Sequence, residues 1–119
     1  MKTKRVLLIV EPPRESLERA AWVMKTKSKK YAGVLIISFP DFETLGHVIT
    51  GARMELIHAI RVHKPKSIQD LAKKVKRDFK NVYQDVKLLA EYGLIDLKEA
   101  GPRKASKPEA KFSEIVLAA

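Results

Sequence analysis

The stretch from Ser67 to Leu97 constrains the fold of this 119-residue chain more than any other segment. Its first part places Ser67 where a helix N-cap is expected and Asp70 three residues later, a spacing close to that of a capping box. Apolar side chains then recur at helical spacing, at Ile68, Leu71, Ala72 and Val75. The pattern predicts a short helix that starts just after Ser67.

A second helix is predicted after a tight basic turn at Lys76 and Arg77. Asp78 is placed to cap it, and Gly93 is placed to end it in a left-handed conformation. The inward stripe of this helix comprises Val82, Val86 and Leu89. A strand-like run follows, with Leu94, Ile95 and Leu97. Helix, turn, longer helix, glycine and strand is the order of a winged helix-turn-helix.

Positive charge is concentrated in the same part of the chain. The whole chain has a net charge of +10, from 24 Lys+Arg against 14 Asp+Glu. Residues 61–111 alone hold 14 basic and 7 acidic side chains. A nucleic-acid-binding surface predicts such clustering, whereas a charge that serves only solubility would be spread evenly.

Several segments carry a resemblance to a known family, namely Phe42–Leu45, Ala52–Arg61, Ser67–Ala72, Arg77–Leu89 and Gly93–Ile95. Through them the chain resembles the winged helix-turn-helix transcriptional regulators of prokaryotes, the MarR-like ones in particular, and among these a group of small archaeal and bacterial DNA-binding regulators. The resemblance covers roughly the last two-thirds of the chain. It implies a DNA-binding fold, but its apolar skeleton is common to many winged helices and implies no particular DNA target.

The first 40 residues predict a separate β-α-β unit. Arg5–Val10 and Gly33–Phe39 are apolar runs typical of strands, and Arg14–Lys27 has helical periodicity between them. Such a crossover unit has parallel strands. Strands that are apolar at nearly every position need cover on both faces, and one helix covers only one. We therefore expect a homodimer, with Trp22, Val34 and Ile36 as interface candidates; Trp22 lying on the Arg19 side chain is the alternative.

The predicted fold class is thus α+β, with three segments. Residues 1–40 form the β-α-β unit, which serves dimerisation, and residues 41–50 form a connector helix with Phe42, Leu45 and Val48 inward. Residues 51–119 form the winged helix-turn-helix, starting with a helix over Ala52–His63. Leu94–Lys98 and Lys111–Leu117 are expected to pair as the two strands of the wing, with residues 101–108 as its tip.

The second helix of the motif supplies the predicted DNA-reading residues. The side chains opposite its buried stripe are Lys80, Asn81, Tyr83, Gln84 and Lys87. Asn and Gln can make paired hydrogen bonds to adenine, and Lys binds guanine or phosphate. The resemblance implies that these positions face the major groove. Phe79 is interpreted as a plug in the core of the motif, and plain solvation is the alternative for the polar face.

Basic side chains flank this helix on both sides. Phosphate contacts are predicted for Lys66, Lys73, Lys76 and Arg77. At the wing, Arg103, Lys104 and Lys107 are predicted to enter the minor groove or to follow the DNA backbone. A solvated loop is the alternative interpretation of the wing tip.

The sequence predicts no metal, no cofactor and no enzyme activity. The chain has no cysteine, and two of its three histidines, His58 and His63, face different sides of a helix. No glycine-rich phosphate loop, nucleophile elbow or paired-histidine motif occurs. The longest apolar runs are far too short to span a membrane, so we expect a cytoplasmic protein.

These observations favour a sequence-specific, double-stranded DNA-binding transcriptional regulator that acts as a homodimer. One alternative is a winged helix that binds protein within a transcription or toxin–antitoxin assembly. Another is a non-specific nucleic-acid binder, which would read shape rather than sequence. No pattern in the sequence indicates a small-molecule effector.

Overall fold

The computed structural model describes residues 5–12, 14–15, 17–18, 33–99 and 106–118, which form a mixed α/β fold. The chain divides into two compact units. The first unit comprises residues 1–47 and 111–119, and the second comprises residues 48–110. Each unit is described by itself.

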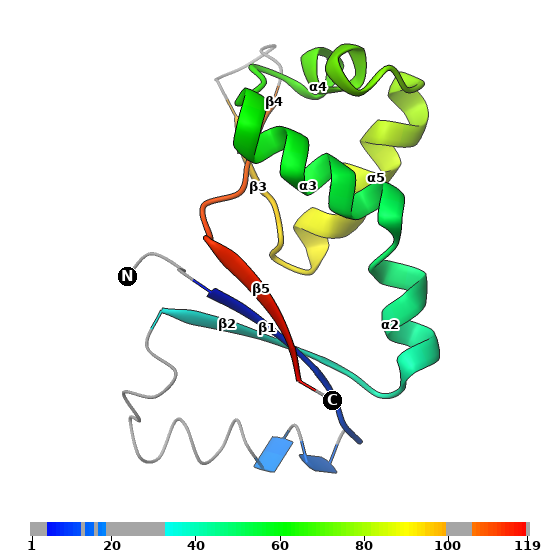
Figure 1. Ribbon diagram of the computed structural model, residues 1–119, viewed down its shortest axis with the longest axis vertical. Coiled ribbons are helices and arrows are strands. Elements are labelled where there is room, and N and C mark those ends of the chain that lie inside the picture. Colours follow the sequence, from blue (N-terminus) through cyan, green and yellow to red (C-terminus); the bar gives the residue numbers. More distant parts are fainter. Residues whose placement is uncertain (1–4, 13, 16, 19–32, 100–105, 119) are drawn as a thin grey trace. The chain divides into compact units, whose positions relative to one another are not determined.

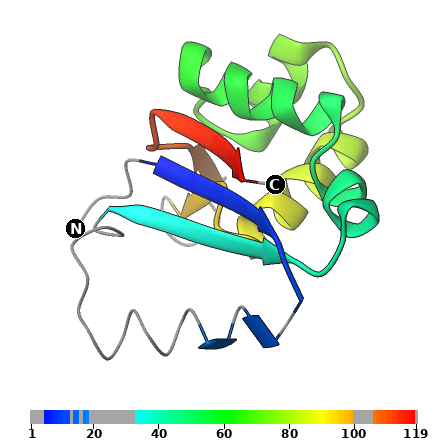
Figure 2. The same ribbon diagram turned by 60° about the horizontal axis from the view of Figure 1, so that its bottom comes forward.

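The first unit is built on a three-stranded parallel sheet (Figure 1). Its strands are β1 (Arg5–Val10), β2 (Val34–Phe39) and β5 (Glu114–Ala118), in the order β2-β1-β5. Figure 2 shows the three strands running in the same direction with β1 between the other two. The predicted parallel pairing of the two N-terminal strands is confirmed. The helix predicted over Arg14–Lys27 is described only at residues 14–15 and 17–18, which are helical.

The two faces of this sheet differ in burial. On one face, Val6, Leu8 and Phe39 have 0%, 3% and 1% of their surfaces exposed, whereas Leu35 and Ile115 are half-buried and Leu117 is 53% exposed. The other face carries Leu7, Ile9, Val34, Ile36 and Val116, since residues paired in the parallel register share a face. Ile9 is buried, but the other four are only half-buried. We call the apolar set of Leu7, Val34, Ile36 and Val116 the half-buried face.

The predicted pairing of Leu94–Lys98 with Lys111–Leu117 is wrong. Glu114–Ala118 pairs with β1 in the first unit, five registered positions in parallel from Arg5 to Ile9. The salt bridge between Arg5 and Glu114 lies at the start of this ladder. The physical reason is the continuous apolar run Ile115–Ala118, which suits a parallel sheet covered on both faces better than a two-stranded hairpin with one face in water.

Helix α2 (Phe42–Val48) starts after Asp41, as predicted. The Thr44 backbone N–H donates to Asp41 Oδ1 over 2.7 Å. Hydrogen bonds from the side chain and the backbone of Thr44 hold the pKa of Asp41 below its usual value, so this cap weakens only when the pH falls through that lowered pKa. Val48 is buried as expected, but Phe42 is 59% exposed and does not point inward.

The second unit begins with three helices that pack against one another in pairs. They are α3 (Gly51–His63), α4 (Ile68–Val75) and α5 (Phe79–Glu91). Each starts at a side-chain cap: Thr50, Ser67 and Asp78 accept hydrogen bonds from backbone N–H groups three residues ahead. Their shared core contains apolar side chains that are at most 3% exposed, including Leu56, Ile57, Ile60, Leu71, Val82, Val86 and Leu89. The predicted inward stripes are confirmed in α3 and α5, and in α4 at Ile68, Leu71 and Ala72, while Val75 is only half-buried.

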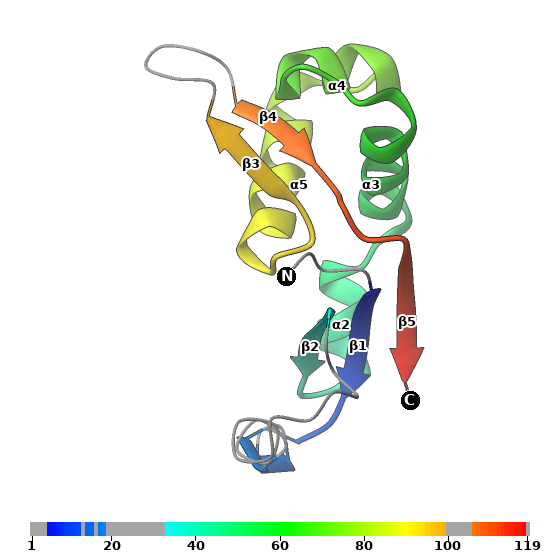
Figure 3. The same cartoon turned by 90° about the vertical axis from the view of Figure 1, so that its left-hand side faces the viewer.

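An antiparallel hairpin completes the second unit (Figure 3). Its strands are β3 (Asp96–Glu99) and β4 (Ser106–Glu109), and β4 contacts both α3 and α4. Pro108 is fully buried in β4 opposite Leu97, a position tolerated because a two-stranded sheet leaves every strand with a free edge. The chain enters the hairpin after Gly93, whose φ of 87° ends α5 as predicted.

The unit boundaries differ from the predicted ones at one place. The predicted divisions at residues 40 and 50 bracket the observed division at 47/48, but residues 111–119 belong with the N-terminal strands. The strand β5 causes this difference, since it pairs with β1 and not with β3.

The start of α4 is held by reciprocal hydrogen bonds. The Asp70 N–H donates to Ser67 Oγ over 3.0 Å, and the Lys66 N–H donates to Asp70 Oδ2 over 3.0 Å. We expect Ser67→Ala to lower the free energy of unfolding by about 1 kcal/mol, because one N–H of the first turn loses its acceptor. Ser67→Asp is the matched control, since it keeps an acceptor and should change stability far less. Urea unfolding of both variants measures the difference, and equal stabilities would contradict the role of this cap.

Candidate nucleic-acid interface

Helix α5 has one completely buried side and one exposed side. Val82, Val86 and Leu89 are each 0% exposed, which fixes the rotation of the helix about its own axis. Successive residues of an α-helix are about 100° apart, so a fixed inner side determines the outer one. Phe79 and Glu91, the first and last residues of the helix, are exposed. So are Lys80, Asn81, Tyr83, Gln84 and Lys87, the five residues predicted to read DNA. We call this set the outer α5 face.

The outer α5 face combines amides, cations and an aromatic ring. Lys87 Nζ lies 5.6 Å from the centroid of the Tyr83 ring, within the range of a cation–π contact. Asn81 and Gln84 are three residues apart, so their amide groups lie on neighbouring turns. Donors and acceptors at this spacing can address the edges of neighbouring base pairs.

Phe79 does not plug the core as expected. It is 48% exposed and lies beside Tyr83, with ring centroids 5.8 Å apart and planes inclined by 32°. The reason is its position as the first residue of α5, four residues before Tyr83 and on the same side of the helix.

The turn between α4 and α5 is tight and well defined by hydrogen bonds. Lys76 adopts a left-handed conformation with a φ of 56°, and the Arg77 N–H donates to the Ala72 carbonyl over 3.1 Å. Asp78 then caps α5 by accepting from the Asn81 backbone N–H over 3.4 Å. The turn predicted at Lys76 and Arg77 and the cap predicted at Asp78 are both confirmed.

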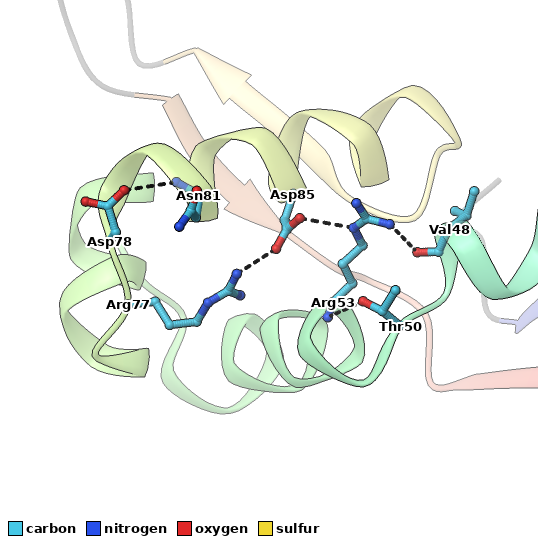
Figure 4. A network of polar contacts seen from close by, with 7 residues as sticks. All are labelled: Val48, Thr50, Arg53, Arg77, Asp78, Asn81 and Asp85. Atoms are coloured by element: carbon cyan, nitrogen blue, oxygen red, sulfur yellow. Dashed lines mark hydrogen bonds and ion pairs between the residues drawn. The ribbon is translucent and has the colours of Figure 1, made fainter.

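An internal ion network connects α3, the turn and α5 (Figure 4). Asp85 Oδ1 accepts from Arg53 Nε over 3.1 Å, and Asp85 Oδ2 accepts from Arg77 Nη2 over 2.8 Å. Arg53 Nη1 also donates to the Val48 carbonyl over 3.1 Å. The side chains of Asp85, Arg53 and Arg77 are only 15%, 20% and 31% exposed, so water screens the pairs weakly. The network therefore fixes α5 to the end of the preceding turn and to α3.

Arg77 differs from its prediction as a phosphate ligand. Its Nη2 is bonded to Asp85, and its Nη1 is buried and has no hydrogen-bond partner within the described residues. A guanidinium directed inward in this way cannot reach a phosphate on the surface without breaking the pair. Arg77 is thus a positioning residue for α5.

The sequence contains a signal for this network that was missed. Arg53 lies on the same helical stripe as Leu56, Ile57 and Ile60, and Asp85 lies on the stripe of Val82, Val86 and Leu89. A charged residue on an otherwise apolar stripe is costly to bury alone. Opposite charges on two such stripes of neighbouring helices indicate an internal pair.

The predicted flanking residues have mixed outcomes. Lys66, Lys73 and Lys76 are exposed, before α4, near its end and at its C-cap. Lys107 lies in strand β4 and not at the wing tip, with its Nζ 3.8 Å from Glu109 Oε1. Arg103 and Lys104 lie outside the described residues, so their predicted DNA contacts stay predictions.

The remaining predicted site residues belong to the first unit. Val34 and Ile36 lie on the half-buried face, and Trp22 lies outside the described residues. Within the described part of the chain, no three His, Asp or Glu side chains are grouped so that they could hold a metal ion. No helix among the same residues is long and apolar enough to cross a membrane.

Breaking the ion network should destabilise the second unit. We expect Asp85→Ala to lower the free energy of unfolding by about 2 kcal/mol, because it leaves two partly buried guanidinium groups without their anion. Asp85→Asn should lower the free energy of unfolding by less, since the amide keeps one acceptor oxygen. The matched control is Asp96→Ala, an exposed position where the change should stay within about 0.5 kcal/mol. Denaturant unfolding would contradict the role of Asp85 if both alanine variants were equally stable.

In a comparison with protein families, the model of the HVO_A0114 family matches residues 48–117. This span includes α3, α4, α5, the hairpin and most of β5, and it is more than half of the 119 residues. Searches of curated proteins and of solved structures found no significant match. Because the matched span covers more than half of the chain, including α3, α4, α5 and the hairpin, the chain belongs to the HVO_A0114 family.

Proposed function

We propose that this protein is a sequence-specific, double-stranded DNA-binding transcriptional regulator whose residues 48–110 form a winged helix-turn-helix. Helices α3, α4 and α5 supply the three-helix core, α4 and α5 with their turn are the helix-turn-helix, and β3 with β4 is the wing. In this assignment α5 is the recognition helix and enters the major groove.

The observation that carries the proposal is the composition of the outer α5 face. Its exposed members are two lysines, two carboxamides and one tyrosine, with no carboxylate among them. Of the two acidic residues of α5, Asp85 is turned inward and neutralised by two guanidinium groups, and Glu91 is exposed at the last position of the helix. A helix face that presents cations and amides, with the central acid turned inward, is suited to DNA, whose backbone is an anion and whose major-groove edges are donors and acceptors.

The nearby lysines support the same assignment. Lys66, Lys73 and Lys76 are exposed on the segment that leads into α5. Lysines beside a recognition helix bind phosphates, which set the register of the protein on the duplex without reading sequence. The proposal therefore separates two roles, with sequence read by the outer α5 face and general attraction supplied by the flanking lysines.

These two roles lead to different results on substitution. We expect Asn81→Ala and Gln84→Ala to fold normally, to keep binding to random duplexes, and to lose about 1–3 kcal/mol of discrimination at one or two base pairs. Lys73→Ala is the contrast: it should weaken binding to every duplex alike and lower the salt dependence by about one unit of slope. Selection from a random-sequence duplex library at physiological salt, followed by titrations, measures both quantities.

The same titrations separate the rival functions. A protein-interaction module would show no selected sequence and a shallow salt dependence. A non-specific nucleic-acid binder would show a steep salt dependence, but the library would stay unenriched. Full retention of the selected sequence by both amide variants would contradict the direct-readout assignment.

We further propose that the regulator acts as a homodimer through the half-buried face of the first unit. Parallel sheets are normally covered on both faces, and this face leaves Leu7, Val34, Ile36 and Val116 partly in water. A second copy would cover these side chains, and two recognition helices would then bind two half-sites of one operator.

Sedimentation tests the assembly directly. We expect the full chain to sediment as a dimer at micromolar concentration and Ile36→Lys to sediment as a monomer with weaker DNA binding, because a charge in the half-buried face cannot be covered by the second copy. Leu117→Lys is the control: it replaces an apolar residue of the same sheet that is 53% exposed and lies on the opposite face. Circular dichroism establishes that both variants are folded. A monomeric wild-type chain would contradict the dimer.

A further inference from the structure

We propose that the aromatic pair Phe79 and Tyr83 reads the 5-methyl group of thymine in the major groove, so that the DNA site of this protein contains A·T pairs opposite the first turns of α5. This inference rests on the proposed function, since it assigns a base preference to the same helix. The observation behind it is the ring pair itself, in which Phe79 is 48% exposed and Tyr83 is 40% exposed.

The pair borders a small open groove in the second unit. The lining residues come from α4, α5 and β4 and are Ile68, Gln69, Phe79, Tyr83 and Ser106; we call this the aromatic groove. Its volume is about 240 Å³. Pockets for drug-sized ligands start at about 300 Å³ and enclose most of the ligand, so the aromatic groove is poorly suited to a small-molecule effector.

Charge near the groove identifies a polyanion as the occupant. Lys80 and Lys87 lie on the same helix and are exposed, and Lys87 stands over the Tyr83 ring. An apolar partner protein would gain little from these cations, whereas a duplex would meet them with its phosphates. Charge complementarity therefore favours DNA as the surface that covers the two rings.

Within a duplex, one group matches exposed aromatic carbon. Thymine is the only base that presents a methyl group in the major groove, and apolar side chains recognise it by contact. Phe79 and Tyr83 form one row along α5, four residues apart, next to the row of Lys80 and Gln84. The amides of Asn81 and Gln84 suit adenine, the partner of thymine, so both rows of the helix favour the same base pair.

The test uses the full chain and the duplexes enriched from a random-sequence library. Each thymine of an enriched duplex is replaced in turn by deoxyuridine, which pairs identically and lacks only the 5-methyl group. At one or two positions the wild-type protein should bind about fourfold more weakly, the effect of leaving one methyl group unburied. Uniform affinity across all positions would overturn the inference without any variant being made.

Variants then assign the effect to the ring pair. Phe79→Ala should bind thymine and deoxyuridine duplexes equally, while Tyr83→Phe keeps both rings and should keep the fourfold ratio. Phe42→Ala is the matched control, since it removes a phenylalanine that is 59% exposed in another helix, compared with 48% for Phe79. It should behave as wild type. Thermal melting establishes that each variant is folded, and Tyr83→Ala serves as a second test of the pair.

The outcomes distinguish the inference from the function on which it rests. If no duplex is enriched, both are overturned. If a duplex is enriched but Phe79→Ala keeps the thymine preference, or binds exactly the same set of duplexes with unchanged affinity, only the methyl-reading role is overturned and the groove is open to a protein.

Discussion

The complete burial of one side of α5 is the constraint on which the second unit depends. Val82, Val86 and Leu89 have no exposed surface, and they pack in a core that also holds Leu56 and Leu71. A helix packed this tightly cannot rotate without opening cavities, each of which would cost several kcal/mol. The buried side chains of α5 therefore determine which of its residues are exposed to a partner.

The ion network around Asp85 restricts the position of α5 further than apolar packing does. Apolar contacts are tolerant of small sliding movements, whereas two hydrogen-bonded ion pairs require particular distances and angles. Arg53 joins α3 to α5, and Arg77 joins the turn to α5. Burying these charged groups costs desolvation energy, which offsets much of their attraction. The network therefore restricts α5 to one defined position rather than adding greatly to the stability of the unit.

Local patterns in the sequence predicted the second unit well. The caps at Ser67 and Asp78, the turn at Lys76 and the end of α5 at Gly93 all depend on residues within a few positions of one another. Such signals act through the backbone nearby, so they can be read without knowing the fold. The outer α5 face followed from the same periodicity.

The errors came where the outcome depends on tertiary partners, whether these are near or far along the chain. Pairing of the last strand with β1 depends on residues more than one hundred positions away, and no local pattern names that partner. The inward turn of Arg77 depends on Asp85, and Phe79 lies 48% exposed beside Tyr83 instead of in the core. In the sequence, a basic or aromatic residue looks the same whether its side chain is turned inward or exposed. Only opposite charges on two apolar stripes would have indicated the pair.

The two units differ in when they can form. Residues 48–110 are continuous in the sequence, so their helices and hairpin can assemble from nearby contacts. The three-stranded sheet joins Arg5 to Glu114, a separation of 109 residues, so it can close only after β5 has been made. Long-range pairing of this kind is slow, and waiting strands with apolar sequences are prone to aggregate. During synthesis, β1 and β2 must therefore remain without their third strand until residues 114–118 have been made and have left the ribosome.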